Sequence, residues 1–245
     1  MSINEPYVRT FNRYELKYLL PHARAMAFLA DLAGYCSVDP HSDPQRGYPV
    51  YSLYWDSSDF DAFWEKIDGQ KYRRKLRFRR YANDDDSVFV EIKQRIDRTV
   101  QKRRMRMPLD KVSRVFTPRG VDTTAEYEIE DSVGQEALFL AHKLDLRPMM
   151  AVLYRRMAYF GNYDAELRIT LDSRVQYDSH ALDIAKPFET GKYVLAPEVS
   201  VLEIKYNNHV PIWLTKLVAR HELPIVRYSK YCSAIDRQYF NGTYT

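Results

Sequence analysis

The chain has 245 residues, of which 45% are hydrophobic and 29% are charged, and this balance fits one folded domain over residues 1–245. Its 8 glycines and 12 prolines are too few for a collagen-like or low-complexity protein, while 20 tyrosines favour β-strands over a helical bundle. The formal net charge of +4 is too small to indicate a polyanionic partner, so a basic site must come from local arrangement.

The sequence also lacks the signals of export, membrane insertion and several common active sites. Residues 1–15 carry charges and a proline where a secretory signal needs an apolar core, and no apolar run is long enough to span a bilayer. Cys36 and Cys232 stand in no metal or redox pattern, and the six histidines share no spacing. No P-loop, G-x-G-x-x-G or G-x-S-x-G motif is present. We therefore expect a cytoplasmic protein without a disulfide framework or a structural zinc.

The predicted elements begin with a strand over 9–19, where polar and apolar residues alternate. Pro21 then opens a helix that ends at Gly34, since proline suits the first helical turn and glycine the position after the last. A strand is predicted over 51–56. A short helix through Ile67 follows it, and the candidate N-caps of this helix are Ser57, Ser58 and Asp59.

The middle of the chain predicts three consecutive strands, over 71–81, 88–96 and 99–108. The turn-rich segments between them are short, so the three strands form an antiparallel meander. An acidic, irregular stretch over 118–131 comes next, and helical periodicity predicts a helix over 133–144.

The last third predicts a strand pair over 149–160 and 166–177, joined near Gly161, and a further strand over 197–206. A helix is expected from Pro211, and a final helix ends at Phe240.

One short pattern occurs three times, with a glutamate, an aliphatic residue and a lysine in succession at Glu15–Lys17, Glu91–Lys93 and Glu203–Lys205. Because successive side chains of a strand point to opposite faces, each glutamate shares a face with its lysine, and the aliphatic residue lies on the other face. The same alternation adds further cations to these charged faces.

The charged faces have two possible environments. The ordinary arrangement of an antiparallel sheet would place them in solvent. If the sheet closes into a barrel, one face becomes a lumen, and the helices near 21–33, 133–144 and 211–222 can cover the aliphatic outside. The lumen would then contain Glu15, Glu91 and Glu203 among many bases: Arg13, Lys17, Lys75, Arg77, Arg79, Lys93, Lys102, Arg104, Arg156, Arg168, Lys205 and Lys230.

So many cations facing one another imply a polyanionic ligand, because unpaired buried charge is costly. The three carboxylates among them further indicate a divalent metal, since Mg²⁺ and Mn²⁺ are held by carboxylate and phosphate oxygens. Linear phosphate chains meet both requirements. A nucleic-acid partner is not expected, because the basic run 102–106 alternates between the two faces and no aromatic RNA-binding motif accompanies it.

A set of short motifs occurs in consistent order along nearly the whole chain. They are Arg13-x-Glu15-x-Lys17, SLYWD at 52–56, KLRFRRY at 75–81, VEIK at 90–93, YRRMAY at 154–159, RITLD at 168–172, VLEIKY at 201–206 and SKY at 229–231. Together they resemble the VTC-type polyphosphate polymerase domain, which belongs to the triphosphate tunnel metalloenzymes.

The resemblance implies an α+β fold built on a closed eight-stranded antiparallel β-barrel with flanking helices, which binds ATP and polyphosphate or tripolyphosphate with Mn²⁺ or Mg²⁺. It implies that Glu203 is a metal carboxylate. It also implies phosphate-binding bases at Lys17, Arg77, Arg79, Lys93, Lys102, Arg156, Arg168 and Lys230. All of these bases except Lys102 are expected to act in catalysis. Further binding candidates are Arg13, Lys75, Arg104, Lys205 and Ser229. Further metal candidates are Glu15 and Glu91.

The expected reaction is transfer of the ATP γ-phosphoryl group to a growing polyphosphate chain, with release of ADP. Related triphosphatases and adenylate cyclases begin with Glu-x-Glu-x-Lys, whereas Arg13 stands at the first position here, which favours the polymerase. Two alternatives stay open: an inorganic triphosphatase, in which a carboxylate such as Glu15 orients water, and a non-catalytic polyphosphate-binding module.

Overall fold

The computed structural model describes residues 13–245 except 44, 82–83, 98, 126–128 and 208, and it describes the side chains of these residues except 13, 84 and 85. The elements, in chain order, are β1 (Arg13–Pro21), α1 (His22–Ala30), β2 (Cys36–Val38), β3 (Tyr48–Asp56), α2 (Asp61–Ile67), β4 (Tyr72–Tyr81), β5 (Asp84–Ile96), β6 (Thr99–Pro108), α3 (Leu109–Val115), β7 (Phe116–Thr117), β8 (Gly120–Val121), α4 (Ser132–Lys143), β9 (Arg147–Gly161), β10 (Arg168–Asp178), β11 (Lys192–Tyr193), β12 (Val199–Asn207), α5 (Ile212–Arg220) and α6 (Lys230–Tyr239).

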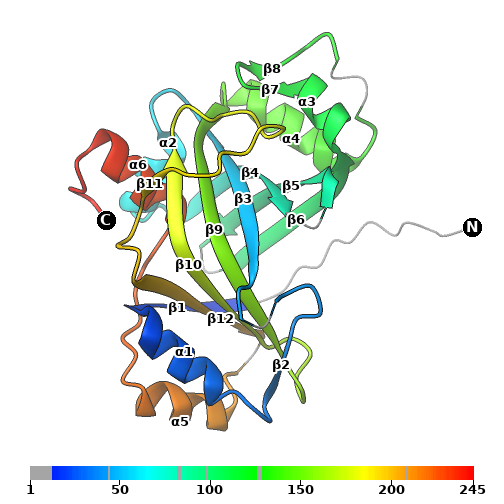
Figure 1. The fold of residues 1–245 in the computed structure, drawn as a ribbon. Coiled ribbons are helices and arrows are strands. Elements are labelled where there is room, and N and C mark those ends of the chain that lie inside the picture. Colours follow the sequence, from blue (N-terminus) through cyan, green and yellow to red (C-terminus); the bar gives the residue numbers. More distant parts are fainter. Residues whose placement is uncertain (1–12, 44, 82–83, 98, 126–128, 208) are drawn as a thin grey trace, which may run out of the picture.

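The main sheet is antiparallel, and its long strands follow one another in the order β1-β12-β10-β9-β3-β4-β5-β6 (Figure 1). These are the eight strands that the sequence predicts; the short β2 and β11 add to β9 and β10. The described backbone pairings leave β1 and β6 at the two edges, so the expected closure of the barrel by hydrogen bonds is not seen among the described residues. The sheet is nevertheless strongly curled. Its curvature brings Lys93 on β5 within 3.3 Å of Glu15 on β1, across the open seam between the edge strands β1 and β6.

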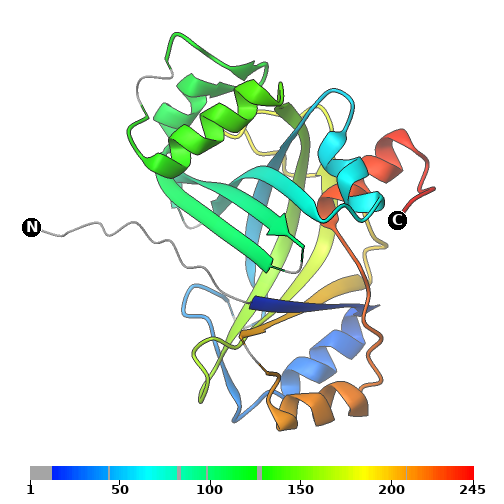
Figure 2. The ribbon, with the colours of Figure 1, turned by 180° about the vertical axis from the view of Figure 1, so that it is seen from behind.

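Apolar side chains on the outer, convex face of the sheet pack against helices, as the sequence analysis expects. One core cluster joins α1 and α5 to β1, β10 and β12, with Phe28 and Leu214 fully buried. A second joins α3 and α4 to β3, β4 and β5, around Phe78 and Leu140. Figure 2 shows the two helical pairs at opposite ends of the curled sheet. The aliphatic face is therefore the covered outside, and the charged face is the concave inside.

Helix α6 closes one end of the concave face. Its residues Tyr231, Cys232 and Ile235 form a third core cluster with Tyr54 and with apolar side chains of β9. The chain leading to α6 is fixed to the edge of β1, since the N–H of Val226 donates to the carbonyl of Lys17 at 2.8 Å. This segment before α6 thus positions the N-terminus of the helix among the charged side chains of the sheet.

Of the expected caps of α2, Ser57 contacts the start of the helix: its hydroxyl accepts from the N–H of Asp61 at 3.1 Å, although the N-cap position itself is Phe60. The helix begins at Asp61, and the buried Asp56 carboxylate accepts hydrogen bonds from the N–H groups of Ala62 (2.8 Å) and Phe63 (3.2 Å). The hydroxyl of Tyr231 on α6 also donates to Asp56. The carboxylate that ends β3 thus joins α2 to α6. Within the described part of the chain, no helix is long and apolar enough to cross a membrane.

Candidate functional site

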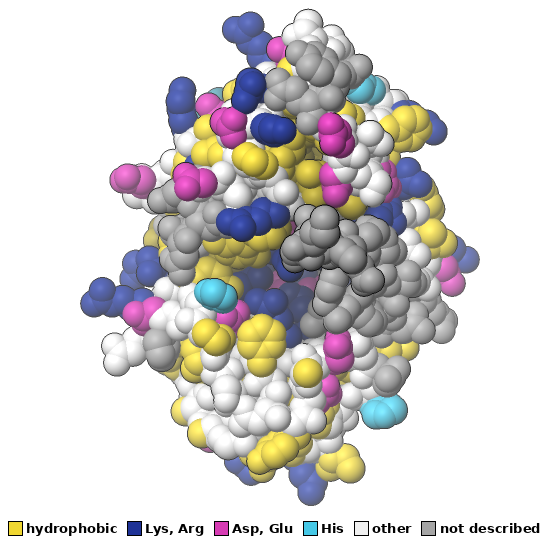
Figure 3. Space-filling view, turned by 90° about the vertical axis from the view of Figure 1, so that its right-hand side faces the viewer, with side chains coloured by type: hydrophobic (Ala, Val, Ile, Leu, Met, Phe, Trp, Pro, Cys, Tyr) yellow, Lys and Arg dark blue, Asp and Glu magenta, His cyan; other side chains and the backbone are white. Residues whose placement is uncertain are grey.

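The concave face collects charged side chains from both walls of the curled sheet. Lys and Arg side chains lie at the bottom of a hollow on the side shown in Figure 3. Strand alternation explains this arrangement, since the pairs Glu91↔Arg104 and Lys17↔Glu203 lie opposite each other in neighbouring strands and share a face. The ionic contacts divide these charges into two clusters.

The first cluster, here the Glu91 cluster, consists of Glu91 with Arg77, Arg79 and Lys102 on strands β4, β5 and β6. The Glu91 carboxylate is 2.5 Å from both Arg77 Nη2 and Lys102 Nζ, and 3.7 Å from Arg79 Nη1. Burial alone would raise the pKa of Glu91, but the three cations hold it well below its usual range. Burial lowers the pKa of Lys102 to about 7, against the effect of Glu91. The Glu91 carboxylate is therefore the shared counter-ion of three cationic side chains.

The second cluster, here the Glu203 cluster, is built around two buried carboxylates, Glu203 on β12 and Asp172 on β10. Asp172 accepts two hydrogen bonds from Arg156, at 2.6 and 2.7 Å, and it lies 2.5 Å from the Nζ of Lys230. Lys230, the first residue of α6, also donates to Glu203 at 3.0 Å. Arg156 Nη2 lies 3.9 Å from Glu203.

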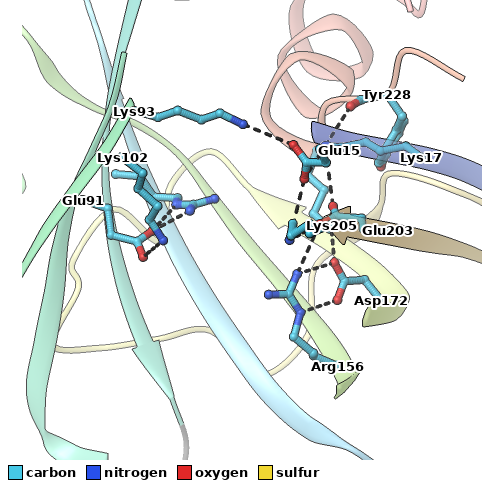
Figure 4. Close-up of polar contacts among 12 residues, drawn as sticks. Glu15, Lys17, Glu91, Lys93, Lys102, Arg156, Asp172, Glu203, Lys205 and Tyr228 are labelled. Carbon is cyan, nitrogen blue, oxygen red and sulfur yellow. Dashed lines mark hydrogen bonds and ion pairs between the residues drawn. The ribbon is translucent and has the colours of Figure 1, made fainter. Parts of the chain in front are cut away.

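Glu15 joins the Glu203 cluster through two lysines that it shares with Glu203. Lys205 Nζ is 2.7 Å from Glu203 and 3.6 Å from Glu15, and Lys17 Nζ is 3.5 Å from Glu203 and 3.7 Å from Glu15. Burial alone would raise the pKa of Glu15, but Lys93, Lys17 and Lys205 together lower it to about 2. Figure 4 shows the two clusters facing each other across the concave face, with Lys93 reaching from the side of the Glu91 cluster to Glu15.

The remaining predicted residues lie near these clusters, with one exception. Arg168 Nη2 is 3.5 Å from Asp39, and Lys75 Nζ is 3.3 Å from Cys232 Sγ. The guanidinium of Arg104 lies 5.1 Å from the centre of the Phe89 ring. Ser229 Oγ accepts from the N–H of Cys232 at 3.4 Å and caps α6. Arg13 begins β1, but its side chain lies outside the described residues.

Sequence reasoning missed two acidic members of the site. Asp172 shares its strand face with Arg168 by simple alternation, but nothing in the sequence marks it as the partner of Arg156. Asp39 follows the short strand β2 and lies close to Arg168 only because of tertiary packing, which no local sequence pattern predicts.

The three carboxylates expected at the metal site lie in two different clusters. Glu91 lies in a different cluster from Glu15 and Glu203, and no group of three or more His, Cys, Asp or Glu residues that could hold an ion occurs within the described residues. Glu15 and Glu203 nevertheless share two lysines. Mg²⁺ is often bound by one or two carboxylates together with substrate phosphates, and this pair supplies such a donor set. Glu91 instead serves as counter-ion to the cations of its own cluster.

The fold and the family follow from comparison with known proteins. A solved candidate adenylate cyclase from Bacillus halodurans shares the fold, with a TM-score of 0.50 and 12% identity over 94% of this chain and 100% of that chain. A candidate adenylyl cyclase from Hippeastrum, described with a dominant triphosphatase activity, gives a TM-score of 0.46 and 14% identity over 91% and 94% of the two chains.

The profile of the VTC domain matches residues 12–239, and the chain therefore belongs to the VTC domain family. Among curated proteins, it is 24% identical over 275 aligned positions to the vacuolar transporter chaperone complex subunit 4 of Schizosaccharomyces pombe. That alignment covers 96% of this chain and 37% of the relative, so the chain corresponds to about a third of the longer protein.

Proposed function

We propose that this protein is a metal-dependent polyphosphate polymerase, which transfers the γ-phosphoryl group of ATP to a polyphosphate chain and releases ADP. The observation that carries the proposal is the excess of cations over carboxylates on one concave face. The described members of the two clusters and their neighbours include Glu15, Asp39, Glu91, Asp172 and Glu203 against Lys17, Lys75, Arg77, Arg79, Lys93, Lys102, Arg104, Arg156, Arg168, Lys205 and Lys230. A linear phosphate chain supplies the missing negative charge.

Unpartnered polar atoms in the same region support a phosphate ligand. Arg79 Nε, Arg168 Nε and Thr170 Oγ1 are buried, and they have no hydrogen-bond partner among the described residues. Buried polar atoms in folded proteins nearly always have partners, so these atoms are suited to an absent ligand. Two guanidinium N–H groups and one hydroxyl can donate hydrogen bonds, and phosphate oxygens are good acceptors of such bonds.

In the proposed reaction, a terminal oxygen of the polyphosphate chain attacks the γ-phosphorus of ATP. A new P–O bond forms there, the bond from the γ-phosphorus to the β,γ-bridging oxygen breaks, and ADP leaves with that oxygen. Catalysis of this kind depends on alignment and charge neutralisation. Arg77, Arg79, Arg156 and Lys230 would bind and orient the phosphoryl oxygens, since buried carboxylates already fix their positions.

Glu203 and Glu15 would hold Mn²⁺ or Mg²⁺, which supplies positive charge to phosphate oxygens when bound. Glu203 is the better anchored of the two, because Lys230 and Lys205 fix its two oxygens from α6 and β12. Closure of the seam between β1 and β6 around a bound phosphate chain, and a cytoplasmic location, belong to the same proposal.

The proposal is tested by incubating the pure protein with ATP and Mn²⁺ and separating the products on a polyacrylamide gel. The proposal expects long polyphosphate together with ADP. Release of orthophosphate without polymer would instead assign the protein to the triphosphatases. Unchanged ATP, with tripolyphosphate binding retained, would identify a non-catalytic binding module.

A further inference from the structure

Two groups of aromatic residues of the concave face lie on either side of the Glu91 cluster. At the α6 end, Tyr54, Tyr154, Tyr228 and Tyr231 are buried by the helix. Toward the opposite end, Tyr81 and Phe89 are only half-buried. Their rings meet edge to face at 5.6 Å between centroids. Of these two groups, the second can therefore receive a flat ligand from solvent.

Phe89 is directly connected to the cations that we assign to phosphate binding. It lies opposite Arg79 in the pairing of β4 with β5, one strand position of the same face away from Glu91. Arg79 Nη1 donates to the hydroxyl of Tyr81 at 3.3 Å. An aromatic surface thus begins where the Glu91 cluster ends.

Arg104 extends this surface toward the open seam of the sheet. Its guanidinium stands 5.1 Å from the centre of the Phe89 ring, on the edge strand β6. The side chain is exposed, and it forms no ion pair with any carboxylate in the described part of the chain. A guanidinium held over a phenyl ring is a planar cation on which a second ring can stack.

We propose that Phe89 and Arg104 bind the base of a nucleoside triphosphate whose phosphates occupy the Glu91 cluster. The inference rests on the proposed function and adds to it the position of the base. A nucleoside triphosphate has an anionic phosphate chain with a flat aromatic base beyond it. On this part of the concave face, the cations of the Glu91 cluster are followed by the half-buried rings of Tyr81 and Phe89, so the phosphates and the base each meet a suitable surface. Stacking of this kind does not distinguish strongly among bases, so the site accepts ATP without excluding other nucleotides.

A second half-buried ring near the concave face, Phe160, is the competing location. The guanidinium of Arg168 lies 5.0 Å from its ring centre, which resembles the arrangement of Arg104 and Phe89. However, the Asp39 carboxylate lies 3.5 Å from Arg168 Nη2 and offsets the charge of this guanidinium, whereas Arg104 has no carboxylate partner in the described part of the chain. Phe160 is therefore a matched control for Phe89.

The experiment compares ATP with tripolyphosphate, which has the anionic chain but no base. Isothermal titration calorimetry without divalent metal measures Kd for both ligands with the parent chain, Phe89→Ala and Phe160→Ala. We expect Phe89→Ala to weaken ATP binding about tenfold and tripolyphosphate binding by less than about twofold, since stacking acts on the base alone. Phe160→Ala should leave the ratio of the two Kd values unchanged.

Phe89→Leu covers the case in which Phe89→Ala folds poorly, because leucine keeps most of the apolar volume and removes the aromatic face. It should show the same selective loss of ATP affinity. An unchanged ratio of Kd values in both Phe89 variants overturns the inference, and so does a selective loss of ATP affinity in Phe160→Ala. If the parent binds neither ligand, the proposed function itself fails. Binding of both by the parent, with no selective loss in the Phe89 variants, refutes the base site alone.

Discussion

Asp172 holds Arg156 by two parallel hydrogen bonds, from Nε at 2.6 Å and from Nη2 at 2.7 Å, in a part of the concave face that solvent hardly reaches. The contact fixes the plane of the guanidinium, because both oxygens of the carboxylate are engaged. The same carboxylate lies 2.5 Å from Lys230 at the start of α6. Asp172 thereby aligns two of the cations that we assign to phosphate binding.

The first prediction concerns the stability that this contact provides. Asp172→Asn should lower the free energy of unfolding by about 3–5 kcal/mol, because it leaves Arg156 and Lys230 buried with too little negative charge. Urea denaturation of the variant and the parent measures the difference. Asp145→Asn removes the partner of Arg147 in an exposed ion pair and should cause no measurable loss. Equal losses in the two variants would contradict the role of Asp172.

The second prediction separates the concave face from the outer face of one strand. Arg79→Met should weaken tripolyphosphate binding about tenfold or more, since it removes a charged donor from the Glu91 cluster. Stability without ligand should also fall, because Glu91 raises the pKa of Arg79 well above its ordinary value against the opposing effect of burial, so the folded protein stabilises the charged guanidinium. Calorimetry and thermal unfolding measure the two effects.

Arg80→Met is the matched control for Arg79→Met. Arg80 is the next residue of β4 and points to the opposite face, where it donates to the carbonyls of Ile184 and Ala185. This variant should bind tripolyphosphate like the parent and unfold at a lower temperature. A loss of affinity of similar size in both variants would mean that the charged face of β4 is not the binding face.

The third prediction concerns pH. Burial lowers the pKa of Lys102 to about 7, with Arg79 and Arg77 acting in the same direction, so the free protein carries this lysine mostly uncharged at pH 8. A bound polyanion favours the protonated form and raises this pKa, so binding at pH 8 should take up a proton at Lys102. At pH 6 the lysine is already charged, and this uptake should be absent.

Calorimetry of tripolyphosphate binding in buffers of different ionisation enthalpy measures the proton uptake. Lys102→Arg stays charged at both pH values, so at pH 8 the parent should take up close to one proton more than this variant. At pH 6 the two proteins should agree. Equal uptake at pH 8 would show that Lys102 does not titrate on binding.

The fourth prediction tests the carboxylate assigned to the metal. Glu203→Gln should lower kcat by about a hundredfold or more, because it removes a charged oxygen donor while keeping the size of the side chain. Steady-state turnover with ATP and Mn²⁺, with circular dichroism as a check of the fold, measures the effect. Glu136→Gln on the outer face, where Glu136 pairs with Arg103, should keep activity within about twofold of the parent. Undiminished turnover in Glu203→Gln would remove Glu203 from the site.

The strands could be predicted because their alternation is strict. The residues of β12 that alternate around Glu203 show this best, since Leu202 and Ile204 face the helices while Glu203 and Lys205 face inward. The helices that cover the outer face were predicted from helical periodicity and from the proline and glycine residues at their ends. Helix α3 was missed, because Leu109–Val115 directly follows a strand and is too short to show periodicity.

The site could be predicted only where both partners lie on regular strands. Glu91 and its bases belong to one meander, so their shared face follows from the sequence. The position of Lys230 depends on where α6 packs, and the contact of Asp39 with Arg168 depends on the path of a loop. The separation of Glu91 from Glu203 also required the curvature of the sheet, which strand alternation does not encode. Local patterns therefore placed the cations and Glu91 on one face, and tertiary structure determined the carboxylate partners of Lys230 and Arg168.

We propose that the concave face transfers the γ-phosphoryl group of ATP to a phosphate chain. The most direct measurement supplies a short polyphosphate primer, Mn²⁺ and ATP labelled at the γ-phosphate, and follows the label on a gel together with the ADP formed. We expect the label to enter chains longer than the primer, with one ADP released for each phosphate added, and we expect Glu203→Gln to abolish both signals. Label recovered only as orthophosphate, with the primer unextended, would contradict this proposal.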